Sequence, residues 1–368
     1  MAVLATVVGA LLLLIVLWDA FETVVLPRTV TRRLRLARLF YFYLGKFWKL
    51  VVRPLAGGRW EAFLGAFGPL SLILLLIFWA LCLILSFALI QWGIGAPLIA
   101  PEPHPGFGSY LYMSGTTFFT LGYGDVTPRT PLSRTLAVGE AGVGFGFLAI
   151  VIGYLPVIYQ SFSRREVGIS LLDARASSPP TATELLRRHA EAGCMEALTR
   201  LLYEWERWAS DLLESHLSYP VLVYYRSQHD RESWLAALTT ILDTCALVSM
   251  GFEEDAAWQK PLLWQAQLTF AMARHAVVDL ALILSTDPAA PEVDRLPPED
   301  FALVRQILQS AGIPLADGAT EKRLAKLRGQ YEPYINGLSR GLHLELPPWI
   351  PPTATVDNWQ TSAWGHFT

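Results

Sequence analysis

The stretch of sequence that decides the fold of this chain is Thr120-Leu121-Gly122-Tyr123-Gly124-Asp125. Its two glycines permit backbone dihedrals that other residues adopt only at a cost. It follows a short apolar segment, 109–119, and lies between two long ones, 67–91 and 134–160. The first long segment has 25 residues and no charge, enough to span a bilayer core, whereas 11 residues are too few. We therefore expect a re-entrant helix and an irregular loop, which at membrane depth must be buried in protein or line a cavity.

Composition supports a membrane domain followed by a water-exposed one. Of the 368 residues, 53% are hydrophobic and 17% are charged, whereas about a quarter of the residues are charged in ordinary soluble proteins. Residues 1–165 carry 13 Lys or Arg and 6 Asp or Glu, but residues 166–368 carry 16 and 26. The first part is suited to a membrane with anionic headgroups and the second to water.

The N-terminal segment, 1–27, is expected to be an additional spanning helix. It lacks the basic start and the Ala-x-Ala site of a cleaved signal peptide. Asp19 and Glu22 are three residues apart and share one helical face. They either mark the membrane–water interface or pair with an arginine of a neighbouring helix.

Segment 28–60 is expected to be an amphipathic helix at the membrane surface. Between Arg28 and Arg59 it carries nine Lys or Arg and no acid, interleaved with aromatic residues, so we expect it to contact anionic lipids. The positive-inside rule places it in the cytoplasm, which puts the N-terminus outside and the C-terminal domain inside. Arg32, Arg35 and Arg38 have the spacing of a voltage sensor, but this segment is short and follows one span, so we do not expect that function.

The remainder is expected to be a helical cytoplasmic domain, 166–345, and a Pro-rich tail, 346–368, that is extended or mobile. No further span is expected there. Apolar residues recur at three- and four-residue steps, and Thr181-x-x-Glu184 predicts a capped helix start. Strand signals are confined to Tyr219–Tyr225, where Pro220 weakens them.

Several function classes lack their sequence signatures. No dinucleotide-binding motif, nucleophile elbow, P-loop or metal-type cluster is present, so we expect no enzyme activity, no cofactor and no nucleic-acid partner. The three cysteines are expected to be reduced and buried, and three histidines to be structural rather than metal ligands. These residues are Cys82, Cys194, Cys245, His216, His229 and His275.

The nine residues from Thr117 to Asp125 resemble the filter of the potassium-channel pore family, which commonly reads Thr-Val-Gly-Tyr-Gly-Asp. The resemblance covers 67–165. It implies a homotetramer in which four loops surround one axis and their backbone carbonyls replace the water shell of K⁺. The implied K⁺ ligands are Thr120, Leu121, Gly122 and Tyr123.

Within this resemblance, the side chains of the loop have separate expected roles. The Thr120 hydroxyl would supply the innermost oxygens, Tyr123 would brace the filter, and Asp125 would concentrate cations at the external mouth. Leu121 replaces the common valine. Because the filter uses its carbonyl, ion binding should survive, while filter rigidity and inactivation are in more doubt.

Further residues are expected to support the filter or to form the gate. Glu140 either hydrogen-bonds behind the filter to Thr116 or Thr117, or faces water. A proline should kink the inner helix, and a glycine can act as a hinge or as a packing site. The support residues are Tyr112, Thr116, Thr117 and Glu140, and the gate residues are Gly144, Gly153 and Pro156.

Together these features predict an all-α membrane protein, with a pore domain at 61–165, that conducts K⁺ passively across the cell membrane. We expect gating at the inner helix and regulation by the helical domain. A receptor built on a pore-like scaffold and a subunit of a potassium uptake system are the alternatives. The sequence leaves the gating stimulus and any cytoplasmic ligand open.

Overall fold

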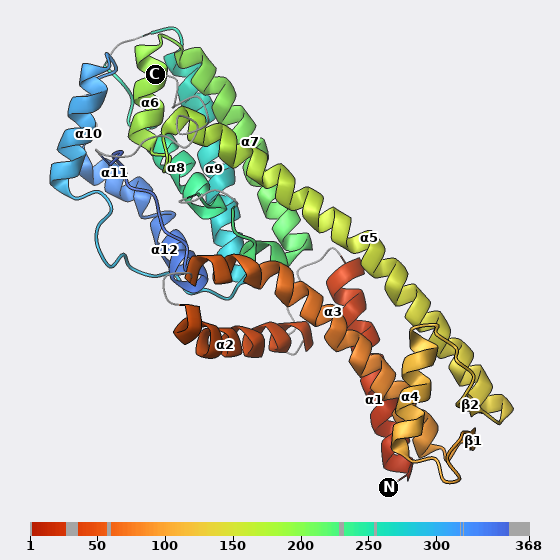
Figure 1. Ribbon diagram of the computed structural model, residues 1–368. Helices are drawn as coiled ribbons and strands as arrows, with labels where there is room; N and C mark the ends of the chain where they lie inside the picture. Colours follow the sequence, from red (N-terminus) through yellow and green to blue (C-terminus); the bar gives the residue numbers. More distant parts are fainter. Residues whose placement is uncertain are drawn as a thin grey trace, which may run out of the picture. The chain divides into compact units, whose positions relative to one another are not determined.

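The computed structural model describes residues 2–26, 36–56, 60–227, 232–253, 256–316, 318 and 320–352. It divides the chain into a membrane unit, residues 1–160, and a helical unit, residues 161–368. The described elements are almost all helices (Figure 1). The chain is thus an all-α, multi-pass membrane protein, as the sequence predicts.

The membrane unit is built on α3. Its elements are α1 (Ala2–Ala20), η1 (Phe21–Val25, a π-helix), α2 (Leu36–Ala56), α3 (Trp60–Gly93), β1 (Leu98–Ile99), α4 (Phe107–Phe118), β2 (Thr127–Pro128) and α5, which runs from Pro131 to Ala176 and continues into the helical unit. The two short strands pair antiparallel and were not anticipated from the sequence. They join the segment that precedes α4 to the segment between the glycine-containing loop and α5.

Small residues let α1 and α3 pack closely. A Cβ atom on Gly9 would lie 2.8 Å from the carbonyl oxygen of Ser86, and one on Gly93 would lie 2.4 Å from Oγ1 of Thr6. Close backbone approach at small residues is a main source of helix association in membranes. The first helix therefore packs tightly along α3.

Asp19 contacts two helices of the membrane unit besides its own. Its Oδ2 accepts hydrogen bonds from Nε1 of Trp79 and from the backbone N–H of Ala37, both at 3.0 Å. Trp79 belongs to α3 and Ala37 to the first turn of α2, so one buried carboxyl joins three helices. Glu22 accepts from Trp18 Nε1 at 2.7 Å.

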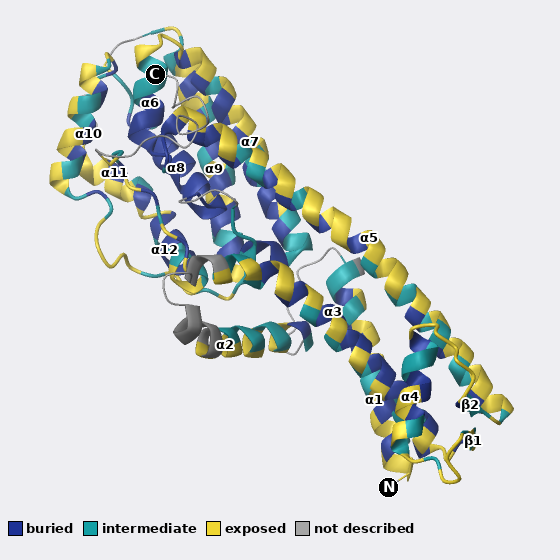
Figure 2. Cartoon of the chain, viewed as in Figure 1, coloured by how far each residue is buried: buried dark blue, intermediate teal, exposed yellow. Residues whose placement is uncertain are grey.

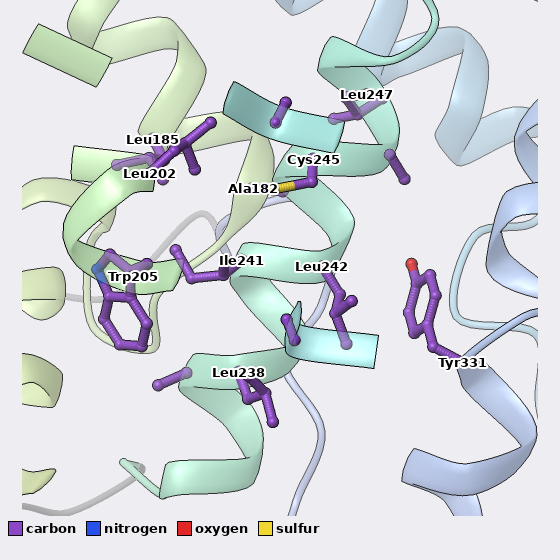
Figure 3. Close-up of a cluster of buried hydrophobic side chains, with 14 of the residues drawn as sticks. Ala182, Leu185, Leu202, Trp205, Leu238, Ile241, Leu242, Cys245, Leu247 and Tyr331 are labelled. Carbon is purple, nitrogen blue, oxygen red and sulfur yellow. The ribbon is translucent and has the colours of Figure 1, made fainter. Parts of the chain in front are cut away.

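The helical unit surrounds α8. Every residue of α8 (Trp234–Val248) is buried, and Figure 2 shows this helix as the darkest. Figure 3 shows apolar side chains from α6, α7 and α8 meeting in this core. The other elements are α6 (Ala182–Glu191), α7 (Met195–Ser218), η3 (Pro220–Tyr224), α9 (Gln259–Ile283), α10 (Pro298–Ser310), α11 (Glu321–Arg328) and α12 (Glu332–Leu342).

Four of the described helices are long and apolar enough to cross a membrane. Three are α1 with η1, α3 and α5, at the positions expected from the sequence. The fourth, α9, was not expected. It is the least apolar of the four and packs against α7 and α8 through Leu262, Ala266 and Val277 in the core of the helical unit.

Local expectations in the helical unit had mixed outcomes. The capped start is confirmed, because Thr181 Oγ1 accepts from the Glu184 N–H at 3.3 Å. The strand signal at 219–225 is wrong: Pro220 begins a 3₁₀ helix, since a proline fixes φ and lacks the N–H that a ladder requires. Cys194 is exposed and not buried, because it lies at the turn before α7, whereas Cys245 is buried in the core.

The start of the Pro-rich tail is packed onto the helical unit. The carbonyl of Pro347 accepts from Arg295 Nε at 3.2 Å, and the Trp349 ring is buried with the guanidinium groups of Arg295 and Arg328 each 5.7 Å from its centroid. Residues 346–352 form no helix or strand and are held by these contacts, so of the two expectations for the tail, extended or mobile, the first is favoured for this part. Residues 353–368 lie outside the described part of the chain.

Candidate functional site

The loop after α4 is held against the end of that helix by its own N–H groups. The N–H groups of Leu121 and Gly122 both donate to the carbonyl of Thr116, at 2.8 and 3.4 Å, and Thr120 donates to Thr117 at 3.0 Å. The main chain of the short helix therefore supports the loop. The two threonines expected to support it do so with their carbonyls, while the Thr116 hydroxyl donates to Met113 within the helix.

The backbone of this loop alternates in handedness. The φ angles of Thr120, Gly122 and Gly124 are +56°, +58° and +78°, whereas those of Leu121 and Tyr123 are negative. Alternating left- and right-handed residues point successive N–H groups to one side and carbonyls to the other. Within the described residues, no donor bonds to the carbonyls of 120–124. The loop thus presents a row of oxygens opposite the face that contacts α4.

A second contact anchors the end of the loop. The Tyr112 hydroxyl donates to Oδ2 of Asp125 at 2.9 Å, which joins α4 to the residue that follows Gly124. This contact and the hydrogen bonds to the Thr116 carbonyl together tie both ends of the loop to α4. The side chains of Leu121 and Tyr123 are exposed, at 54% and 68%, so in a single chain they lack the packing that a brace requires.

Glu140 is buried behind α4 and contacts a residue that sequence reasoning missed. Its Oε1 hydrogen-bonds with the hydroxyl of Ser114, which also donates to the carbonyl of Ile84 at 2.7 Å. These residues come from α5, α4 and α3. The partner is thus Ser114 rather than Thr116 or Thr117. The signal in the sequence was the single carboxyl within an apolar span, which requires a polar partner but does not identify which hydroxyl of 109–119 supplies it.

The hydrogen bonds indicate that this carboxyl is neutral. A serine hydroxyl has one proton, and here it has two acceptors. The other oxygen of Glu140, Oε2, is buried without a hydrogen-bond partner among the described residues. A neutral Glu140 can donate its own proton to the Ser114 hydroxyl, while Ser114 donates to Ile84. A carboxylate would instead leave a buried negative charge nearly unpaired, which is costly.

We expect the free energy of unfolding of Glu140→Gln to lie within about 1 kcal/mol of the native value, because a neutral amide of the same length can donate to Ser114. Glu140→Ala should lose about 1–3 kcal/mol, since it removes the partner and leaves a void. Thermal unfolding in detergent measures both. Glu102→Gln, at an exposed position, is the control for a Glu-to-Gln substitution outside the buried group. Equal destabilisation by Glu140→Gln and Glu140→Ala would contradict this account.

The expected gate residues have different surroundings. A Cβ on Gly144 would lie 2.0 Å from the carbonyl oxygen of Phe118, the last residue of α4, whereas nothing lies within 4 Å of one on Gly153. Gly144 is therefore a packing site. The α5 helix continues through Pro156 without a break. Whether Gly153 or Pro156 acts as a hinge stays a prediction.

The described residues contain no cluster of three or more His, Cys, Asp or Glu that could hold a metal ion. His216 is buried, His275 lies 3.6 Å from Asp279, and His229 is outside the described residues.

One comparison with known proteins covers the part of the chain that holds this loop. Residues 70–160 match a family model described as ion channel. The chain is 23% identical to the uncharacterized membrane protein YdjJ of Bacillus subtilis (strain 168) over 257 residues, which cover 67% of this chain and 69% of the relative. That match is longer than the membrane unit, so it extends into the helical unit.

Two further relatives carry the name Protein LctB. The one from Geobacillus stearothermophilus is 32% identical over 105 residues, covering 25% of this chain and 78% of the relative. The one from Bacillus caldotenax is 33% identical over 87 residues, covering 21% and 64%. No solved structure gives a significant match.

Proposed function

Because this chain belongs to the ion channel family through residues 70–160, we propose that it is a passive, potassium-selective channel whose filter is the loop 120–125. The observation that carries the proposal is the alternating φ sign at 120–124, with carbonyls that accept no hydrogen bond from the described residues. A row of free carbonyls can replace the hydration shell of K⁺ without fixed charge.

Electrostatics near the loop favour a cation. The loop follows the C-terminal end of α4, where the aligned peptide dipoles place about half a negative charge. Asp125 adds a carboxylate after the last glycine and is oriented by Tyr112. The proposed K⁺ ligands are the carbonyls of Thr120, Leu121, Gly122 and Tyr123, with the Thr120 hydroxyl at the inner end.

A homotetramer is proposed because one chain supplies one filter strand. Support comes from an apolar stripe on α5 with a seven-residue repeat, 64–74% exposed in the single chain. Sustained seven-residue repeats are typical of helices that pack against copies of themselves. The stripe consists of Val138, Phe145, Ile152 and Tyr159.

The proposed orientation has the N-terminus outside and the helical unit in the cytoplasm, where it would regulate the pore. Helix α2 would then lie on the inner membrane surface. Its Phe42, Phe47 and Leu50 are exposed, and Lys46 Nζ lies 4.1 Å from the Phe42 ring centroid. Apolar residues with a basic flank suit a surface of anionic lipids.

The test is ion flux from the purified full-length protein in liposomes, with K⁺ compared with Na⁺. We expect K⁺ flux to exceed Na⁺ flux by at least about tenfold, which corresponds to about 1.4 kcal/mol of discrimination. Native mass measurement should give four times the chain mass of 40.9 kDa. Equal flux of the two ions would refute the selectivity, and a monomer or dimer would refute the shared filter.

A further inference from the structure

The part of α5 that lies in the helical unit, 161–176, contains a buried arginine. The Arg165 side chain is only 2% exposed, and arginine is almost never so buried unless it is paired. Its neighbour Arg164 is exposed. Two adjacent arginines thus occupy opposite environments on a helix that began at Pro131, next to the filter loop.

The Arg165 guanidinium binds the η3 segment of the helical unit. Nη1 donates to the carbonyl of Leu222 at 3.0 Å and Nη2 to that of Tyr225 at 2.7 Å, while Nε donates to Glu166 at 3.0 Å. These carbonyls belong to η3 and the residue that follows it. The planar guanidinium suits this forked arrangement, which a lysine cannot reproduce.

Helix α7 holds the same turn of α5 from another side. Nε1 of Trp208 donates to the main-chain carbonyl of Arg165 at 3.1 Å. A Cβ on Gly168 would lie 2.5 Å from that indole nitrogen. Tight packing and hydrogen bonds therefore join α5, α7 and η3 at one point, which we call the Arg165 clamp (residues 165, 208, 216, 222 and 225).

His216 completes the Arg165 clamp in its neutral form. Its Nε2 lies 3.3 Å from Arg165 Nη1, and its Nδ1 lies 2.7 Å from the carbonyl of Leu212. Because arginine only donates, Nε2 must accept, so the ring proton is on Nδ1 and points to Leu212. A second ring proton would face the guanidinium directly.

The surroundings of His216 oppose its protonation. Burial first, and then the charge of Arg165, lower the pKa of His216 from 6.5 to about 3. On the α5 side, the His216 ring faces Arg165, whose charge is partly balanced by Glu166. On the α8 side, it faces the uncharged Trp234 ring, with 5.7 Å between the two ring centroids. The η3 segment contributes backbone carbonyls. Glu214 and Asp211 on its own helix are exposed.

We infer that Arg165 is a positioning residue that fixes one turn of α5 against α7 and η3, and that protonation of His216 releases this contact and changes the activity of the channel. The inference rests on the channel function of the chain and not on its ion selectivity. Because α5 is one continuous helix from Pro131 to Ala176, release of the turn at Arg165 alters the constraint on the part of the helix that follows the filter loop in the chain.

The size of the acid effect follows from linkage. The released state, with an ordinary histidine, binds more protons than the clamped state between pH 6.5 and about 3, so the clamp weakens as the pH falls through 6.5. Between pH 7 and pH 5 the ratio of released to clamped chains should rise about 25-fold. Above pH 7 the ratio should hardly change.

The test compares variants of the full-length channel in planar bilayers, with the pH varied on the side of the helical unit. Acidification from pH 7 to 5 should move the open probability of the native channel towards that of Arg165→Gln, which lacks the clamp at every pH. Arg164→Gln, the exposed neighbour, should behave like the native channel. His216→Gln should keep both contacts, since its amide can accept from Arg165 and donate to Leu212, but should lose the acid response.

Hydrogen exchange of the same proteins separates this inference from the proposed function. At pH 5, after correction for intrinsic exchange rates, the segment 220–227 should lose protection in the native chain but not in His216→Gln. An acid response of the same size in His216→Gln would overturn the inference, and so would native gating in a folded Arg165→Gln channel. If no variant conducts any ion, the channel function fails, and the exchange result alone decides whether the clamp exists.

Discussion

Gly122→Ala should abolish the preference for K⁺ over Na⁺. The φ angle of Gly122 is +58°, where a Cβ costs about 1–2 kcal/mol per residue, and in a tetramer the strain occurs four times around one axis. The chain can relieve it by rotating the peptide and turning a carbonyl away from the ion. Since about 1.4 kcal/mol is a factor of ten in an equilibrium, we expect the K⁺/Na⁺ flux ratio in liposomes to fall at least about tenfold.

Gly95→Ala is the matched control. Gly95 has a φ angle of +67°, and like Gly122 it has open space where a Cβ would be added. It lies in the turn after α3, so the substitution carries similar backbone strain outside the proposed filter. The K⁺/Na⁺ ratio should be unchanged in this variant. A filter at 120–125 would be contradicted if both variants lost selectivity equally, or if neither variant lost it.

Gly144→Ala should prevent formation of a stable, active channel. The added methyl group would lie 2.0 Å from the carbonyl oxygen and 2.8 Å from the carbonyl carbon of Phe118. These are backbone atoms at the end of α4, so they cannot rotate away as a side chain can. Over-packing of this kind typically costs about 1–3 kcal/mol, and the required shift of α5 would displace the helix that supports the loop.

Gly146→Ala is the control on the same helix, because nothing lies within 4 Å of its added Cβ. Alanine is a better helix former than glycine by about 1 kcal/mol, so this variant should be at least as stable as the native chain. Fluorescence-detected size exclusion after heating measures the oligomer, and liposome flux measures activity. A Gly144→Ala channel with native stability and altered gating alone would instead support a hinge at this position.

Local chemistry made the architecture around the loop predictable. Length and the absence of charge located α3, and the short apolar segment 109–119 corresponds to α4, Phe107–Phe118. The glycines at 122 and 124 predicted unusual dihedrals, which the structure confirms. The positive φ of Thr120 was not foreseen, since threonine rarely adopts this region. Composition did not foresee the contacts that hold residues 346–352, because the burial of Trp349 against Arg295 and Arg328 depends on packing.

The positions of the irregular loop and of its flanking helices were thus determined by the sequence alone. Allowed backbone dihedrals, helix length and apolarity depend on residues that are neighbours in the chain. The partners of the buried polar groups were decided only by the tertiary structure. Glu140 and Ser114 are 26 residues apart, Asp19 and Trp79 are 60 apart, and Arg165 and Leu222 are 57 apart. A buried polar group must find a partner, but which one it finds depends on how the helices cross.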